Sequence, residues 1–291
     1  MLLFTDSKAL PLSIQCNKGR LGNQLCTYAT LYGLGHLNDQ RSTVALGCNI
    51  NKLKAEFRHL SIPRAPFLYF RWNPWSILSY LRPVDATIPP NSNFINGFVY
   101  PCSYTFFDHV REQIRQEFQF TEEVQLYARQ VLEKANVHQL QNPTYVGIHV
   151  RRGDYKNRWL DIYKGLAVNM EFFQKAIEYF RNKYQSVIFL VVSDDRPWCV
   201  ENLSGPLGVY VTEKASSPVH DLAVLAHCNH TVMTYGTYGF WGAYLAGGEV
   251  VYFDKFLKPN TSFVNNNFIF DKMYPPRWKG IVTTNVSLID W

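Results

Sequence analysis

The residues best suited to chemistry in this sequence lie in the segment Val146-Gly-Ile-His-Val-Arg-Arg-Gly-Asp-Tyr155. A guanidinium group such as that of Arg151 or Arg152 can donate two parallel, charge-assisted hydrogen bonds, which suits phosphate oxygens. Gly153 would let backbone approach a ligand closely, and Asp154 could orient an arginine or act as a base. An Arg–Asp salt bridge that only stabilises a loop is the alternative interpretation.

A second polar cluster follows the apolar run at 189–192, where Asp194 and Asp195 are adjacent. Carboxylates are pure acceptors, so they can bind ribose hydroxyls or a guanine edge. A helix N-cap and a divalent metal site are the alternatives. However, no Asp-x-Asp occurs in the sequence, so the motif that usually holds a divalent cation on a nucleotide diphosphate is missing. We therefore predict no metal.

Two turns rich in small residues could cradle a phosphate group or close over a ligand. One is Thr234-Tyr-Gly-Thr-Tyr-Gly-Phe-Trp-Gly242, which would expose backbone N–H groups at a helix N-terminus. It is neither a Walker loop nor a Gly-x-Gly-x-x-Gly fingerprint. The other is Gly19-Arg-Leu-Gly-Asn-Gln24, which by itself is more simply a connector between a strand and a helix.

Alternating strands and helices would position these segments. We expect strands at 145–150, 186–192, 209–212, 231–234 and 250–253, and helices at 171–184, at 218–227 and from Phe240, with Asn169 as an N-cap. The run at 186–192 is apolar and rich in β-branched residues, as in a parallel strand covered on both faces. This alternation predicts a doubly wound α/β domain, whose ligands bind beyond the carboxyl ends of the strands.

The first half of the sequence is less regular. Strands are expected at 12–16 and 42–46, with a helix between them at 24–37. Two amphipathic helices come later in the chain and place Ile114 and Val124 inward. Residues 57–104 are rich in proline and aromatic residues and give no assignment. A polar break at 136–143 separates the halves, so we predict lobes at 1–140 and 141–291.

Composition limits the classes of protein that this chain can belong to. Its 291 residues are 47% hydrophobic, which excludes a disordered or fibrous chain. The net charge of +6 favours anionic partners or simple solubility. Because the basic residues are scattered, we predict no nucleic-acid partner. The longest apolar run, at 187–192, is far below the roughly 20 residues that cross a bilayer. Contact with a membrane would thus need an anchor outside this sequence.

The cysteines and the glycosylation sequons give weaker indications of function than the motifs above. None of the 6 cysteines forms a Cys-x-x-Cys pair, which argues against structural zinc and leaves disulfides open. Asn-x-Ser/Thr triplets begin at Asn202, Asn229, Asn260 and Asn285, and they weakly favour a secretory context.

Taken together, the motifs at 19–24, 146–155 and 221–248 resemble those of animal galactoside α-1,2-fucosyltransferases, in the family's order and spacing. The stretches at 97–104 and 198–203 also look like family segments. The resemblance implies a two-lobed GT-B-type glycosyltransferase that carries fucose from GDP-β-L-fucose to the 2-hydroxyl of a terminal β-galactose. It implies inversion, no metal, and the Golgi lumen, although the family's transmembrane anchor is not in this sequence.

The resemblance also implies roles for individual residues. Arg151 would hold the β-phosphate and, with Asp154, form the catalytic pair. The other expected binding residues are His149, Arg152, Asp194 and Asp195 on the donor side, Gly236, Thr237, Tyr238 and Gly239 at the diphosphate, and Arg20, Asn23 and Gln24 in the first lobe.

The sequence gives less information on the catalytic base and on the residues that bind the acceptor sugar. Asp154 is the first candidate for the catalytic base, and Asp221 and His220 are the next candidates. The leaving group can also accept the proton itself. Aromatic faces for the acceptor sugar are available at Trp72, Trp75, Tyr104 and Trp159. Two alternative functions stay open: another GDP-fucose-dependent transferase, such as a protein O-fucosyltransferase, or a non-catalytic protein that binds glycans or polyanions.

Overall fold

The computed structural model describes residues 11–14, 19–43, 50–64, 74–77, 87–88, 92–97, 102–155, 165–257 and 274–283. The chain divides into a first unit, Met1–Gln119 with Asn267–Tyr274, and a second unit, Phe120–Asn266 with Pro275–Trp291. The sequence predicts this boundary at residue 140, whereas the structure places it after Gln119. The reason is helix α4 (Glu122–Ala135), whose buried side chains Val124, Ala128 and Leu132 pack within the second unit.

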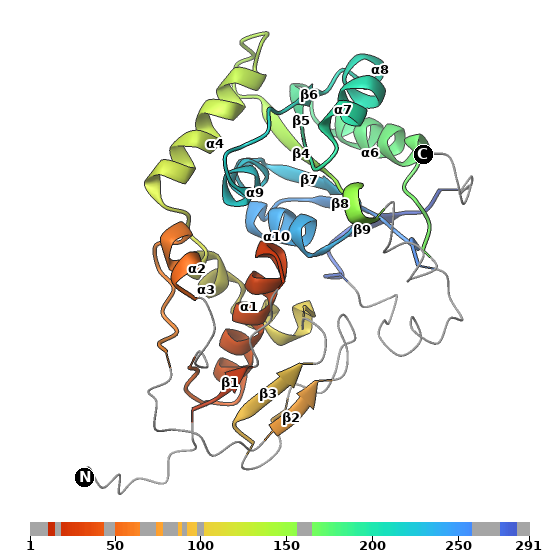
Figure 1. Ribbon diagram of the computed structural model, residues 1–291. Coiled ribbons are helices and arrows are strands. Elements are labelled where there is room, and N and C mark those ends of the chain that lie inside the picture. Colours follow the sequence, from red (N-terminus) through yellow and green to blue (C-terminus); the bar gives the residue numbers. More distant parts are fainter. Residues whose placement is uncertain are drawn as a thin grey trace, which may run out of the picture. The chain divides into compact units, whose positions relative to one another are not determined.

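A six-stranded, wholly parallel sheet forms the centre of the second unit (Figure 1). Its strands are β4 (Thr144–Val150), β5 (Val187–Ser193), β6 (Tyr210–Val211), β7 (His230–Met233), β8 (Val250–Phe253) and β9 (Lys279–Ile281). They lie in the order β6-β5-β4-β7-β8-β9. If the six strands are numbered along the chain within this unit, their order in space is that of dinucleotide-binding sheets. The direction in which successive strands are added to the sheet reverses between β4 and β7. The predicted doubly wound sheet is confirmed.

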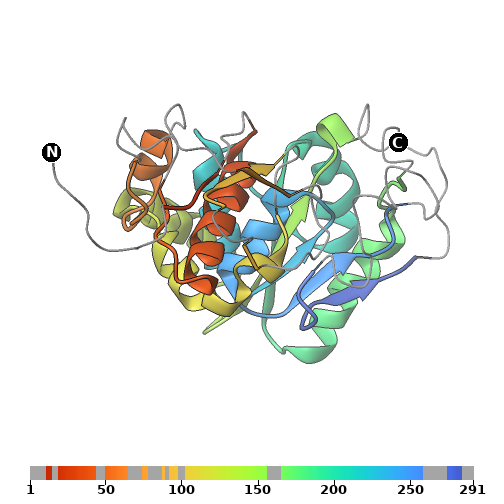
Figure 2. The same cartoon turned by 90° about the horizontal axis from the view of Figure 1, so that it is seen from below.

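Helices cover both faces of this sheet (Figure 2). The helix α6 (Met170–Lys183) lies on one face, and α9 (Pro218–His227) and α10 (Thr237–Ala246) lie on the other. Two short helices, α7 (Arg196–Cys199) and α8 (Gly205–Leu207), follow β5, with the π-helix η4 (Val200–Ser204) between them. The Asn169 side chain accepts a hydrogen bond from the Phe172 N–H at 3.2 Å, so the expected N-cap of α6 is confirmed.

The first unit has its own small sheet, in which β1 (Ser13–Ile14), β3 (Phe94–Gly97) and β2 (Pro74–Ile77) lie side by side and parallel. Its helices are α1 (Leu21–Leu37), α2 (Ile50–Glu56) and α3 (Arg111–Glu117), with 3-10 turns η1 (Tyr104–Phe106) and η2 (Asp108–Val110) before α3. The strand expected at 42–46 is represented by a single bridge between Leu12 and Ser42, and residues 44–46 lie outside the described residues.

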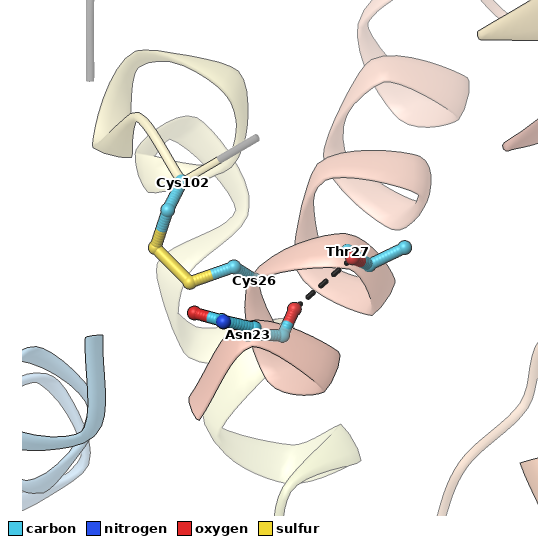
Figure 3. Close-up of a disulfide and its surroundings, with 4 residues drawn as sticks. All are labelled: Asn23, Cys26, Thr27 and Cys102. Atoms are coloured by element: carbon cyan, nitrogen blue, oxygen red, sulfur yellow. Dashed lines mark hydrogen bonds between the residues drawn. A yellow bond between two sulfur atoms is a disulfide. The ribbon is translucent and has the colours of Figure 1, made fainter. Parts of the chain in front are cut away.

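A disulfide between Cys26 and Cys102 ties α1 to the segment just before η1, across a separation of 76 residues (Figure 3). In the same turn of α1 the Thr27 hydroxyl donates to the Asn23 carbonyl oxygen at 3.0 Å. The buried Glu117 carboxylate adds a second tie, because it accepts the Tyr28 hydroxyl at 2.5 Å and the Ser61 N–H at 2.7 Å. Both ties hold the N-terminal half of α1 inside the first unit.

None of the helices in the described part of the chain is long and apolar enough to cross a membrane.

Candidate active site

Arg151 lies at the point where the strand order of the large sheet reverses. It directly follows β4, and its backbone N–H donates to Thr234 Oγ1 at 3.0 Å. Thr234 directly follows β7, and its own N–H donates to the carbonyl oxygen of His149 at 3.2 Å. The two bonds join the carboxyl ends of the neighbouring strands. Arg151 therefore stands at the sheet edge where ligands of such folds bind, with its side chain 18% exposed.

Two carboxylates flank the guanidinium of Arg151. Its Nη1 lies 2.7 Å from Asp194 Oδ2, and its Nη2 donates to Asp154 Oδ1. The loop salt bridge that the sequence left open as an alternative is thus present. An anion that binds Arg151 would exchange with one of these carboxylates, because both occupy the guanidinium fork.

Arg152 points into the protein and contributes to packing. Its side chain is only 2% exposed, and its Cζ lies 3.9 Å from the centroid of the Trp198 ring. Its Nε lies 2.9 Å from Asp195 Oδ2. Arg152 is thus buried beneath the site between Trp198 and Asp195, and its predicted role toward the donor stays a prediction.

The two acidic residues after β5, Asp194 and Asp195, contact Arg151 and Arg152. Asp194 Oδ1 accepts from the Arg152 N–H at 2.9 Å, while its other oxygen faces Arg151. Asp195 accepts from the Trp198 N–H, which confirms the N-cap interpretation for this residue. Among the described residues there is no group of three or more His, Cys, Asp or Glu arranged for a metal ion.

The turn before α10 brings a helix N-terminus to the same edge. Gly236 is the N-cap residue and has a φ of 92°, a conformation that side chains with a Cβ rarely adopt. The Tyr155 ring stacks on Tyr235 with centroids 4.6 Å apart, and it lies beside Gly236. The first N–H groups of α10 belong to Thr237, Tyr238 and Gly239. Such groups favour anions.

His149 is buried beneath this turn, 4% exposed. Burial, and secondarily the charge of Arg151, lower its pKa to about 3, so the imidazole is neutral at ordinary pH. Its Nδ1 is buried and has no hydrogen-bond partner among the described residues. Its ring faces Tyr238, with centroids 5.6 Å apart, and a Cβ added to Gly239 would lie 3.0 Å from Cε1. Only glycine at 239 lets α10 approach β4 this closely.

The other two candidate bases are engaged by neighbouring groups. His220 Nδ1 lies 2.9 Å from Ser217 Oγ, and its Nε2 lies 3.1 Å from Glu123 Oε1. Both oxygens of Asp221 accept from Arg196 Nη2, at 2.8 and 2.9 Å. Arg196 is not among the predicted site residues, because its only signal in the sequence is its place directly after the acidic pair.

Three predicted residues belong to the first unit, around the N-terminus of α1. Arg20 is exposed at the N-cap position, Asn23 is partly exposed, and Gln24 Nε2 donates to the Gly19 carbonyl oxygen at 2.8 Å. Their role toward a ligand stays a prediction. Among the aromatic residues considered for the acceptor, Tyr104 begins η1 and the backbone of Trp75 lies in β2, whereas Trp72 and Trp159 are outside the described residues.

The model of glycosyl transferase family 11 matches residues 4–282. The chain belongs to glycosyl transferase family 11. This family 11 member is 35% identical over 275 residues to galactoside 2-alpha-L-fucosyltransferase Sec1 of Mus musculus, covering 91% of this chain and 72% of that relative. It is 36% identical to galactoside alpha-(1,2)-fucosyltransferase 2 of Sus scrofa, with 90% of this chain and 78% of that relative covered. The resemblance noted in the sequence is confirmed.

Solved structures confirm the GT-B-type fold of this family 11 glycosyltransferase. A mutant of Arabidopsis thaliana FUT1, in complex with GDP, has a TM-score of 0.54 at 11% identity, covering 87% of this chain and 72% of that chain. POFUT1 in complex with GDP has a TM-score of 0.53 at 10% identity, covering 86% and 99%. At these identities the likeness concerns the fold alone.

Proposed function

We propose that this chain is a galactoside 2-α-L-fucosyltransferase. It carries fucose from GDP-β-L-fucose to the 2-hydroxyl of a terminal β-galactose, with inversion at the sugar carbon. The observation that carries the proposal is the placement of Arg151 beside the N-terminus of α10, where the strand order reverses. The printed name of a relative 35% identical over most of the chain supports the fucosyl group and the linkage, and the solved structures of similar fold that contain GDP support the nucleotide.

The diphosphate of the donor would bind the Arg151 guanidinium and the first N–H groups of α10. Phosphate oxygens can replace the carboxylates of Asp154 and Asp194 on that guanidinium, because phosphate accepts the same pair of hydrogen bonds. As GDP departs, negative charge grows on the β-phosphate. Preorganised donors stabilise this charge in the transition state. Because these groups supply the positive potential, we propose that transfer needs no metal ion.

Asp154 is the base that we propose for the galactose 2-hydroxyl. Its side chain is 31% exposed and lies at the same edge of the sheet as Arg151. His220 and Asp221 are less suitable. Both imidazole nitrogens of His220 already have hydrogen-bond partners, and both carboxylate oxygens of Asp221 accept from Arg196. If Asp154→Asn keeps the wild-type kcat, the departing diphosphate is the remaining acceptor for the proton.

One assay tests the proposed function directly. Radiolabelled GDP-fucose is incubated with lactose, or with a folded protein domain as the acceptor, with and without EDTA. We expect labelled fucosyl-lactose with an α-1,2 linkage, at equal rates in both buffers. Label on the protein domain alone would instead favour a protein O-fucosyltransferase. Binding of polyanions that falls steeply with salt, without turnover of GDP-fucose, would favour a non-catalytic protein.

We further propose that the enzyme works in the Golgi lumen. The Cys26–Cys102 disulfide supports an oxidising compartment, because disulfides seldom persist in the cytosol. The exposed sequon residue Asn229 fits the same setting. Microscopy of the tagged chain together with a Golgi marker tests the location, and a uniformly cytosolic signal would contradict it.

A further inference from the structure

Arg196 joins three separate elements at the carboxyl edge of the large sheet. Its Nε donates to the Thr212 carbonyl oxygen, just after β6, at 2.8 Å, and its Nη1 donates to the Ser193 carbonyl oxygen at the end of β5. Its Nη2 donates to both carboxylate oxygens of Asp221, in the first turn of α9. All three nitrogens of the guanidinium are thus engaged, and its side chain is 15% exposed.

The same contacts continue from α9 to the turn that begins α10. The Tyr238 hydroxyl donates to the carbonyl oxygen of Pro218, the first residue of α9, at 2.5 Å. Tyr238 belongs to the first turn of α10, and its ring faces His149. The first turn of α9 therefore connects two sets of hydrogen bonds, one from Arg196 to Asp221 and one from Tyr238 to Pro218, and so links Arg196 to the turn proposed to hold the diphosphate.

Arg196 is also the cation closest to the Asp221 carboxylate. Burial raises the pKa of Asp221, and the hydrogen bonds and charge of Arg196 oppose that rise. The other titratable groups that face Asp221 are His220 on its own helix, Tyr127 of α4 and Tyr238 of α10. Neither tyrosine carries a positive charge, so the loss of Arg196 would leave a buried carboxylate without its main counter-charge.

We propose that Arg196 is a positioning residue for the nucleotide donor: it touches no ligand, but it fixes the start of α9, and through Tyr238 the first turn of α10, against the ends of β5 and β6. This inference rests on the proposed function for the identity of the donor. It assigns Arg196 to the nucleotide side of the site and not to the acceptor.

Arg196→Met tests the proposal through three readouts. We expect the KM for GDP-fucose to rise about tenfold or more, while the KM for lactose changes by less than about threefold. The Kd for GDP in calorimetry should rise by the same factor as the KM for GDP-fucose. The acid limb of kcat/KM for GDP-fucose should move to higher pH, because Asp221 then binds a proton more readily. An Arg196→Met variant with normal affinity for GDP and an unchanged pH profile would overturn the proposal, even if its Tm fell.

Two further variants separate positioning from general stability. Arg196→Lys keeps the charge but places all of its donors on one nitrogen, which cannot span the positions that Nε, Nη1 and Nη2 of Arg196 occupy, so we expect an intermediate Kd for GDP without a pH shift. In Arg196→Met/Asp221→Asn no carboxylate remains to titrate, so we expect the pH shift to vanish. The control is Arg181→Met, which changes an exposed arginine of α6 that donates to the Leu207 carbonyl oxygen.

If Arg196→Met does not fold, Arg196→Lys decides the matter, since wild-type GDP affinity in that variant would overturn the inference. Calorimetry with GDP needs no acceptor, so it tests Arg196 even if lactose proves to be the wrong acceptor. Failure of the proposed function would appear separately, as GDP binding by the wild-type chain without fucosyl transfer.

Discussion

At the scale of single residues, the reaction depends most on the guanidinium of Arg151. Lysine can keep the positive charge but presents a point charge instead of a planar fork. We expect Arg151→Lys to lose at least about tenfold in kcat, because loss of a preorganised donor to a transition-state charge typically costs roughly 100-fold or more. Initial rates with saturating GDP-fucose and lactose provide the measurement. An exposed arginine of α4, changed in Arg129→Lys, is the control and should keep its full rate.

His149 offers a second test at this scale, through its lowered pKa. Its pKa is about 3 when folded, against an ordinary value of 6.5, so below pH 6.5 the unfolded chain binds a proton that the folded chain does not. The stability due to the neutral imidazole is therefore fully present above pH 6.5 and is lost as pH falls toward 3. The expected slope is about 1.4 kcal/mol per pH unit.

Urea unfolding at pH 6.5, 5.5 and 4.5 measures this slope, and His149→Asn provides the comparison. We expect the variant to lose stability with falling pH less steeply than the wild type, by about one proton. The His149 imidazole should also show no chemical-shift change by NMR between pH 5 and 8. A titration midpoint near 6.5 would show that the ring is not buried as described.

At the scale of elements, the N-terminus of α10 depends on Gly236. Alanine at this position would have to adopt a φ of 92°, and its Cβ would lie 3.4 Å from the Tyr155 hydroxyl. We expect Gly236→Ala to cost about 1–3 kcal/mol of stability and to raise the Kd for GDP about tenfold, because the turn that orients the N–H groups must shift. Differential scanning calorimetry and GDP titration measure the two effects.

Gly205 is the matched control for this substitution. It lies at the start of α8 with a φ of −66°, and nothing stands within 4 Å of an added Cβ. Gly205→Ala should therefore leave the GDP affinity unchanged and stability equal or slightly higher. Equal losses in both glycine variants would contradict a specific role for the α10 turn.

The sequence predicted the elements of the second unit closely, because each strand there is a short apolar run and each helix has an apolar stripe or a clear cap. The strand at 250–253 and the helix at 218–227 have the predicted bounds. In contrast, β9 was missed, since Lys279 and Gly280 are exposed and the segment has no apolar alternation. In the first unit, β2 and β3 lie in the proline- and aromatic-rich region at 57–104, where no periodicity marks a strand.

The sequence predicted that the candidate residues lie at the strand ends, but it did not predict which side chains contact one another there. The rule that ligands bind beyond strand ends located Arg151, because it depends only on the order of elements. The partners of each side chain depend on distances across the sheet edge, which spacing along the chain does not encode. For this reason neither the contact between Asp194 and Arg151 nor the Arg196–Asp221 pair, 25 residues apart, was foreseen.

At the scale of the whole molecule, the two units differ in how they depend on oxidation. The first unit contains the Cys26–Cys102 disulfide, whereas the cysteines described in the second unit, Cys199 and Cys228, are free and buried. Burial raises the pKa of Cys199 to about 11 and that of Cys228 to about 12, so neither is a reactive thiolate at neutral pH. A reducing agent should therefore act on the first unit.

Replacing the bonded pair in Cys26→Ser/Cys102→Ser removes a crosslink between residues 76 positions apart. In the loop-entropy description, such a crosslink stabilises the folded state by about 4 kcal/mol. We expect calorimetry to show the transition of the first unit lowered by roughly 10 °C or more, while GDP protects the second unit as in the wild type. A reductant should lower the wild-type transition by at least the same amount. If both transitions fell together, the units would unfold cooperatively, and the disulfide would support the nucleotide site as well as α1.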